Sequence, residues 1–209
     1  MNYLAHAYLS FNDPQLLVGN LISDFVKGKK KLDYPEGIRN GITLHRAIDS
    51  FTDTHESTRQ AKLFFREAYG LYSGALVDVL YDHFLANDLK EFPEQGPGPG
   101  LAAFAERCYE QLSPYEPVFP ERFRRMFPYM RSQNWLYNYR FKQGILNSFE
   151  GVSRRALYMA SPARAGELFE THYQELGACY QSFFPAVKDF AFTFLRQLPG
   201  TSNSFTFGG

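Results

Sequence analysis

The chain has 209 residues, with 22 basic and 22 acidic side chains, so its formal net charge is zero. Hydrophobic residues make up 44% and charged residues 21%. The chain is therefore too apolar to be disordered, and no apolar run approaches the roughly 20 residues of a membrane span. Balanced charge excludes a global attraction to nucleic acid or anionic lipid, and we expect neither as a partner.

The N-terminus and the cysteines indicate the compartment. No basic segment leads into an apolar stretch at the start of the chain, so we expect neither a signal peptide nor a transit peptide. Two cysteines, Cys108 and Cys179, are too few for a disulfide framework and lack the spacing of a zinc knuckle. We therefore expect a cytoplasmic protein with reduced thiols.

Apolar residues recur at intervals of three and four along nearly the whole chain, and few segments alternate with period two, which favours helices over strands. Several predicted helices begin at a recognisable signal, such as Pro14 after Asp13 and Pro162 after Ser161. The sequence predicts an all-α protein with helices at residues 2–10, 14–26, 35–53, 56–68, 73–87, 101–112, 120–131, 137–160 (where Gly151 is a candidate break) and 162–198.

Residues 91–100 are rich in proline and glycine and cannot be helical. Both flanking halves are helical and neither contains a repeat, so we interpret this segment as a surface loop. We expect residues 1–200 to form a single bundle of about nine helices. Residues 201–209 are small and polar, which is typical of a flexible tail.

Acidic and histidine side chains fall on apolar faces of the predicted helices in the first 90 residues. In the second helix, Asp24 follows Leu17 and Leu21 at helical spacing and is expected to point inward. In the third helix, His45 and Asp49 are four residues apart on a face that is at least half buried. The fifth helix adds Asp82 and His83, and the short apolar N-terminal helix adds His6.

Burying several ionised carboxylates costs several kcal/mol each unless a cation compensates, so we expect these helices to converge on a divalent metal. Histidine nitrogen with carboxylate oxygen, and without thiolate, suits Mn, Fe, Zn or Mg sites that keep open positions for water. Such sites serve metal-assisted hydrolysis. The predicted ligands are His6, Asp24, His45, Asp49, Asp82 and His83.

A single buried histidine or a spaced pair of aspartates is more often structural than a metal ligand, so the hypothesis depends on the whole set. His55 lies between two predicted helices and is interpreted as a loop residue. His172 lies on a predicted helix face with Leu168 and Leu176 and is interpreted as a core or rim residue. Neither is included among the ligands.

Four segments resemble one known family, the acyl carrier protein phosphodiesterases. They are residues 1–6 (MNYLAH), 19–28 (GNLISDFVKG), 44–53 (LHRAIDSFTD) and 78–85 (DVLYDHFL), with weaker echoes in residues 133–136 (QNWL) and 153–155 (SRR). Together they extend from residue 1 to about residue 155 in the order that the family has. The four segments are jointly specific, although none is decisive alone.

The resemblance implies an all-α, HD-domain-like enzyme that uses a divalent cation, typically Mn²⁺, with Mg²⁺ or Fe²⁺ as alternatives. It also implies the reaction: hydrolysis of the phosphodiester that joins 4′-phosphopantetheine to a serine of holo-acyl carrier protein. We expect Asp24, His45, Asp49 and Asp82 to be catalytic. Arg46 follows His45 in place of the aspartate of a strict His-Asp pair, so ligand roles cannot be copied from the wider HD superfamily.

Acyl carrier proteins are small and acidic, so the resemblance implies a basic docking surface. Lys27, Lys29, Lys30 and Lys31 follow the helix that carries Asp24, and they are the stronger candidates. A second group contains Arg122, Arg124 and Arg125, with Arg131 further along. Without the resemblance, each group is interpreted as a run of solvated charged residues on the surface. The predicted substrate-binding residues are Arg46, Lys27, Lys29, Lys30, Arg154 and Arg155.

Two other functions remain open at this point. One is an HD-like phosphohydrolase that acts on a nucleotide or another small phosphate ester, with the same metal site and no protein partner. The other is a helical bundle that stores metal or contains a buried polar network without catalysis. The sequence lacks the paired Glu-x-x-His motifs of ferritin-like bundles, which disfavours the second alternative.

Overall fold

The computed structural model describes residues 1–95, 98, 100–153 and 161–200. Over these residues the secondary structure is helical and contains no strand, which confirms the all-α prediction. No helix among them is both long enough and apolar enough to cross a membrane. The predicted tail at residues 201–209 lies outside the described residues, and so do Arg154 and Arg155.

The described residues form eleven α-helices and four short 3₁₀ helices. The α-helices are α1 (Tyr3–Tyr8), α2 (Pro14–Ile22), α3 (Glu36–Thr54), α4 (Glu56–Tyr69), α5 (Ser73–Ala86), α6 (Leu101–Leu112), α7 (Glu121–Ser132), α8 (Trp135–Asn138), α9 (Lys142–Ser153), α10 (Pro162–Thr171) and α11 (Tyr173–Leu195). The 3₁₀ helices are η1 (Ser23–Phe25), η2 (Gly28–Asp33), η3 (Gly70–Tyr72) and η4 (Ser113–Val118).

Side-chain caps fix several helix starts. The Asp13 carboxylate accepts hydrogen bonds from the backbone N–H groups of Gln15 and Leu16, both at 2.9 Å, and so begins α2. At the start of α4 the capping residue is His55, whose Nδ1 accepts from the Ser57 N–H at 3.2 Å. His55 is thus a helix cap, in agreement with its exclusion from the predicted ligands.

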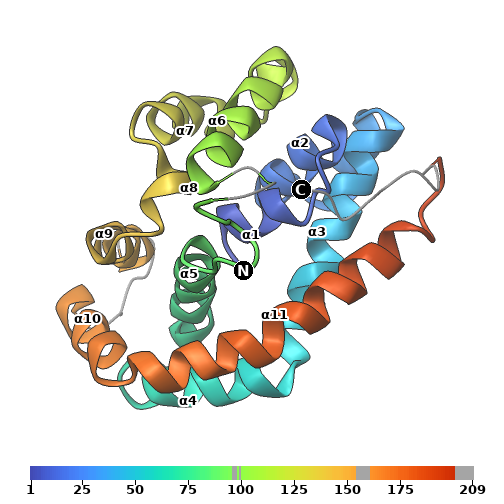
Figure 1. Cartoon of the computed structure of the whole chain (residues 1–209). Helices are drawn as coiled ribbons and strands as arrows, with labels where there is room; N and C mark the ends of the chain where they lie inside the picture. The colour runs from blue at the N-terminus through green and yellow to red at the C-terminus, as the bar shows by residue number, and fades with distance from the viewer. Residues whose placement is uncertain (96–97, 99, 154–160, 201–209) are drawn as a thin grey trace.

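Helix α1 lies near the centre of the molecule and is flanked by longer helices (Figure 1). It packs against α2 and α5, while α11 runs along α3, α4 and α5. Two aromatic contacts connect this region to the next part of the chain: Phe25 of η1 with Phe123 of α7, and Tyr3 with Trp135 of α8. Helix α1 and the turn η1 therefore contact elements from both halves of the chain.

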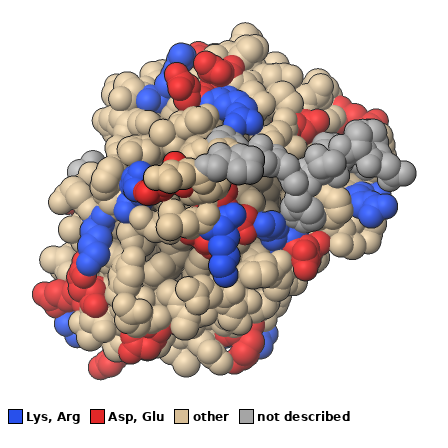
Figure 2. Space-filling view, viewed as in Figure 1, with Lys and Arg blue, Asp and Glu red and all other residues tan. Residues whose placement is uncertain are grey.

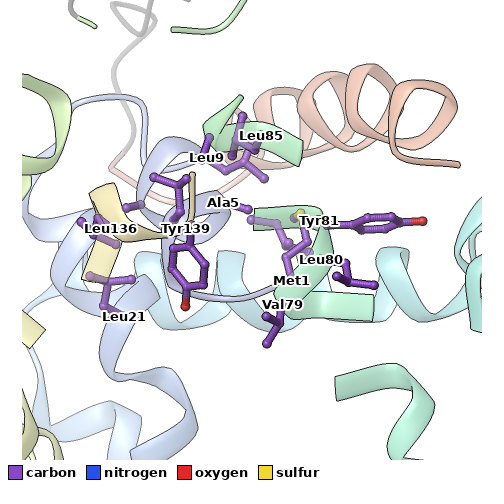
Figure 3. Close-up of a cluster of buried hydrophobic side chains, with 14 of the residues drawn as sticks. Met1, Ala5, Leu9, Leu21, Val79, Leu80, Tyr81, Leu85, Leu136 and Tyr139 are labelled. Carbon is purple, nitrogen blue, oxygen red and sulfur yellow. The ribbon is translucent and has the colours of Figure 1, made fainter. Parts of the chain in front are cut away.

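The start of the chain is buried in the hydrophobic core. Met1 is 6% exposed and lies beside Val79 and Leu80 of α5 (Figure 3). Leu136 and Tyr139, from the segment around α8, belong to the same cluster of buried hydrophobic side chains and lie on another side of it. Burial of this apolar surface fixes α1 against α5, and hence the direction in which the polar side chains of α1 point.

Helices α2 and α3 cross at two glycines. A methyl group on Gly19 would lie 2.1 Å from the backbone oxygen of Ile38, and one on Gly41 would lie 2.4 Å from the backbone oxygen of Leu16. Only residues without a side chain fit such a contact. The two backbones therefore approach closely, which brings the end of α2 next to the middle of α3.

Gly19→Ala is expected to lower the free energy of unfolding by about 1–3 kcal/mol, because the added methyl group must push the two helices apart. Urea denaturation of the purified variant measures this loss. Gly151→Ala is the matched control, since a methyl group there meets no atom of the described residues within 4 Å. The control is expected to be neutral or slightly stabilising, and a Gly19 variant as stable as the control would contradict the close crossing.

Two predicted helices are broken in the structure. The predicted helix at 162–198 divides into α10 and α11 at His172, because α10 packs on α9 and α4 whereas α11 follows α3, α4 and α5. The predicted helix at 137–160 is interrupted before Lys142, where the chain turns between α8 and α9 and Gly144 lies against the backbone of Asn138. The predicted total of about nine helices was therefore too low.

Candidate active site

Two histidines and one aspartate form a compact polar cluster. His6 comes from α1, and His45 and Asp49 come from consecutive turns of α3. Asp49 links the imidazoles: its Oδ1 lies 3.1 Å from His6 Nε2 and its Oδ2 lies 3.0 Å from His45 Nε2. The two rings stack with centroids 4.0 Å apart. All three residues are predicted ligands, and the structure brings them together.

Asp24 lies at the edge of this cluster. Its Oδ1 is 3.2 Å from His45 Nε2, so it is close to one imidazole. Its side chain is 73% exposed, which corrects the prediction that it points into the core. The reason is local: α2 ends at Ile22, and the 3₁₀ turn η1 rotates Asp24 outward. Because the imidazoles are buried and the carboxylates reach solvent, the cluster is accessible from one side.

The cluster has an excess of negative charge. Burial lowers the pKa of His45, but its hydrogen bonds to Asp24 and Asp49 outweigh burial and raise that pKa to about 9. Burial, with repulsion from His45, lowers the pKa of His6. Burial raises the pKa of Asp49, but the two histidines outweigh burial, and the net pKa of Asp49 is below that of an ordinary aspartate. The hydrogen bond to His45 lowers the pKa of Asp24. One imidazolium thus faces two carboxylates.

The donor set fits a divalent cation. Two ligand atoms that are each about 2.1 Å from a metal ion, at right angles, are about 3 Å apart. The nitrogen–oxygen distances within the cluster are 3.0–3.2 Å. His6, His45 and Asp49 each offer one ligand atom within 4.8 Å of the others. Imidazole nitrogen with carboxylate oxygen is a donor set for Mn, Fe or Zn, and Asp24 can add a further oxygen.

The raised pKa of His45 predicts a pH-dependent stability in the presence of a chelator. The pKa of His45 is about 9 in the folded chain, compared with the ordinary histidine value of 6.5. The contribution of protonated His45 to the free energy of unfolding is therefore fully present below pH 6.5 and is lost as pH rises through 9. The loss is expected to be on the order of 2 kcal/mol, because the exposed Asp24 is screened by solvent.

Urea denaturation at pH 7 and pH 9.5 measures this loss. The buried amino group of Met1 has a pKa raised by Asp78 and Asp49 against the effect of burial, and it acts in the same direction. His45→Gln separates the two contributions, since it removes only the histidine. An equal pH dependence in the variant and the wild type would show that His45 contributes nothing.

Asp82 is completely buried but lies outside the cluster. Its carboxylate accepts backbone N–H hydrogen bonds from Leu4 at 2.7 Å, Asn2 at 3.1 Å and Ala5 at 3.2 Å. Burial raises its pKa to about 7, against these three donors and the amino group of Met1. A carboxylate at a helix N-terminus is favoured by the unpaired N–H groups there. Asp82 therefore caps α1, the helix that carries His6, and it is not among the three residues whose ligand atoms lie together.

His83 also has partners away from the cluster. Its Nδ1 lies 2.7 Å from the backbone oxygen of Tyr139, and its Nε2 lies 3.1 Å from the hydroxyl of Tyr173. Burial lowers its pKa. Both ring nitrogens have protein partners, so the structure places His83 apart from His6, His45 and Asp49.

Three further residues lie near the cluster, and two of them, Met1 and Asn20, were not anticipated from the sequence. The amino group of Met1 is 2.8 Å from Asp78 Oδ1 and 3.9 Å from Asp49 Oδ1. Asn20 is fully buried and its Oδ1 lies 3.0 Å from His6 Nδ1. An amide within the apolar stretch at residues 16–22 was the available signal for Asn20, since a buried amide requires partners.

The predicted substrate-binding residues are exposed where they are described. Arg46 donates to the backbone oxygen of Val26 at 2.7 Å and so braces the segment after Asp24. Lys27, Lys29 and Lys30 are exposed in and beside η2. On the face drawn in Figure 2, basic and acidic side chains are interspersed on a mostly uncharged surface. That face therefore shows no extended basic patch among the described residues.

The fold and the cluster together define an all-α protein with a His–Asp centre of the kind that hydrolases use. The family model described as "Acyl carrier protein phosphodiesterase" matches residues 1–187. The chain belongs to this family of phosphodiesterases, which confirms the predicted enzyme class.

Curated relatives agree with the family model. The acyl carrier protein phosphodiesterase of Yersinia pestis is 34% identical over 187 residues, which cover 90% of this chain and 95% of the relative. That of Klebsiella pneumoniae is 32% identical over 185 residues, which cover 88% and 94%. That of Photorhabdus laumondii is 31% identical over 185 residues, which cover 88% and 92%. No solved structure matches the chain, so the HD-domain likeness stays a prediction.

Proposed function

We propose that the chain is a divalent-cation-dependent hydrolase that releases 4′-phosphopantetheine from the serine of holo-acyl carrier protein. The observation that carries this proposal is the cluster of His6, His45 and Asp49, in a chain whose relatives are named for this substrate. The proposed ligands are these three residues together with Asp24.

When bound, a divalent cation such as Mn²⁺ supplies Lewis acidity for a phosphoryl oxygen and lowers the pKa of a bound water. The chain's own groups prepare this chemistry. Asp49 places one carboxylate oxygen opposite each imidazole, and the exposed sides of Asp24 and Asp49 leave access for a phosphodiester. Arg46 follows His45 in the sequence, is exposed, and is proposed as a cation that contacts the phosphate.

Support for a protein substrate comes from the segment after Asp24. It presents Lys27, Lys29 and Lys30 together with Leu32, whose side chain is 59% exposed. Exposed lysines beside an exposed leucine suit a small acidic partner, with charge for attraction and apolar surface for contact. By contrast, Arg124 and Arg125 on α7 are close to Glu121, which offsets their charge.

The decisive experiment is incubation of the purified protein and Mn²⁺ with holo-acyl carrier protein and, separately, with a panel of nucleotides. We expect conversion of the holo protein to the apo protein, observed by mass spectrometry as loss of the phosphopantetheine group. Turnover of nucleotides without conversion of the carrier protein would replace the proposal with the small-ester alternative.

The double variant Lys27→Glu and Lys29→Glu is expected to raise KM for holo-acyl carrier protein several-fold with little change in kcat. The reason is that docking contacts are equal in the ground state and the transition state. Added salt is expected to have the same effect, because exposed charges are screened over about 10 Å at 0.1 M ionic strength. Steady-state kinetics at two salt concentrations measures both effects.

Two controls accompany this prediction. Lys90→Glu reverses an exposed lysine elsewhere and is expected to leave KM unchanged. A small artificial phosphodiester does not contact the docking surface, so the double variant is expected to hydrolyse it normally. Equal losses on both substrates would place the lysines at the phosphate site or in the fold.

A further inference from the structure

The fully buried amide of Asn20 is part of a closed set of hydrogen bonds with His6 and Ser10. Asn20 Oδ1 lies 3.0 Å from His6 Nδ1, and Asn20 Nδ2 lies 3.1 Å from Ser10 Oγ. Ser10 Oγ in turn donates to the backbone oxygen of His6 at 2.8 Å. Asn20 and Ser10 are 0% and 1% exposed, so water does not compete for these contacts.

The directions of these hydrogen bonds follow from which atoms carry hydrogen. A backbone carbonyl only accepts, so the single hydroxyl hydrogen of Ser10 is directed to the carbonyl of His6. The Ser10 oxygen must then accept from Asn20, which places the amide nitrogen towards Ser10 and the amide oxygen towards His6. An amide oxygen also only accepts. His6 Nδ1 therefore carries the hydrogen.

A neutral imidazole with hydrogen on Nδ1 has its lone pair on Nε2. In this chain, His6 Nε2 faces Asp49 Oδ1 at 3.1 Å, so that an unprotonated nitrogen and a carboxylate oxygen lie opposite each other. Two acceptors repel at this distance unless a proton or a metal cation lies between them. The hydrogen bonds around Asn20 therefore favour the form of the cluster in which a cation lies between His6 Nε2 and Asp49 Oδ1.

We infer that Asn20, oriented by Ser10, is a positioning residue that fixes the Nδ1–H tautomer of His6 and so directs Nε2 at a divalent cation beside Asp49. The inference rests on the metal site of the proposed function. Partners that hold the second nitrogen of a ligating histidine fix its tautomer and raise its basicity, and their loss costs about 10–100-fold in metal affinity.

The tautomer can be measured without metal or substrate. Long-range ¹H–¹⁵N correlation spectra of the chelated protein, with ¹⁵N-labelled histidine rings, distinguish Nδ1–H from Nε2–H, and His6→Gln identifies the His6 signals. We expect the Nδ1–H pattern for His6 in the wild type, although an isolated neutral histidine prefers Nε2–H. The Nε2–H pattern would overturn the inference directly.

Three variants test the network. Asn20→Asp keeps an acceptor opposite Nδ1 and is expected to keep the tautomer. Asn20→Leu removes the acceptor, and Ser10→Ala lets the amide rotate, so both are expected to show the Nε2–H form. If Asn20→Leu does not fold, Ser10→Ala still decides the question. Ser148→Ala is the control, since Ser148 donates to a carbonyl four residues earlier on α9 in the same way.

Calorimetric titration with Mn²⁺ provides the second measurement. Asn20→Leu and Ser10→Ala are expected to weaken binding about 10–100-fold, while Asn20→Asp and Ser148→Ala stay within a few-fold of the wild type. Wild-type affinity in Asn20→Leu would refute the positioning role. If the wild type itself binds no divalent cation, the metal dependence of the proposed function is refuted, and so is the inferred role of His6 Nε2. The spectra still test the tautomer of His6 independently.

Discussion

Replacing Asp49 with alanine is expected to lower the rate of carrier protein hydrolysis by about three orders of magnitude or more. Asp49 is the residue that contacts both His6 and His45, and it supplies a ligand oxygen of the proposed metal site. A bound metal contributes several kcal/mol of transition-state stabilisation, and each 1.36 kcal/mol corresponds to about tenfold in rate. The measurement is kcat with holo-acyl carrier protein, with circular dichroism to confirm the fold.

Asp53→Ala is the matched control for this prediction. Asp53 lies one turn further along α3 and pairs with Lys62 at 2.8 Å, outside the cluster. We expect its rate to stay within about twofold of the wild type, as for other surface substitutions. Asp24→Ala is expected to lose activity less completely than Asp49→Ala, because Asp24 contacts one imidazole only. A fully active Asp49→Ala enzyme would remove Asp49 from the active site.

Helix positions followed from hydrophobic periodicity, whereas the changes of chain direction did not. Residues 101–112 were predicted as a helix and form α6 with the same bounds, because a regular apolar face and the preceding glycine determine them locally. The break at His172 has no comparable signal. The helical pattern continues through it, and the packing of α10 and α11 on different neighbours decides where the chain turns.

In the site, too, the sequence pattern predicts which residues face inward, but the tertiary structure decides what they contact. Inward-facing positions predicted His6, His45 and Asp49, which the structure brings together. Asp82 has the same pattern in sequence, but its oxygens accept the N–H groups of α1. A carboxylate beside two histidines and one that caps a distant helix have the same sequence pattern. Only the tertiary position of α1 distinguishes them.

Manganese(II) is expected to raise the melting temperature of the chelated protein by about 5–10 °C. A ligand that binds only the folded chain at a hundred times its Kd stabilises it by about 2.7 kcal/mol, and 1 kcal/mol corresponds to about 2–4 °C for a chain of this size. Thermal denaturation with chelator and then with excess Mn²⁺ measures the difference. Asp49→Ala is expected to abolish the shift, whereas Asp53→Ala is expected to retain it.

The size of the shift with different ions tests the donor set. Two imidazole nitrogens favour Mn²⁺, Fe²⁺ or Zn²⁺ over Mg²⁺, which prefers oxygen ligands and keeps its water. We therefore expect Mg²⁺ to stabilise the chain less than Mn²⁺ at equal concentration. A larger shift with Mg²⁺ would mean that the carboxylates bind the ion without His6 and His45. If none of the four ions shifted the melting temperature at millimolar concentration, the hydrolysis would have to depend on the side chains alone, with His45 and Asp49 as the remaining acid and base.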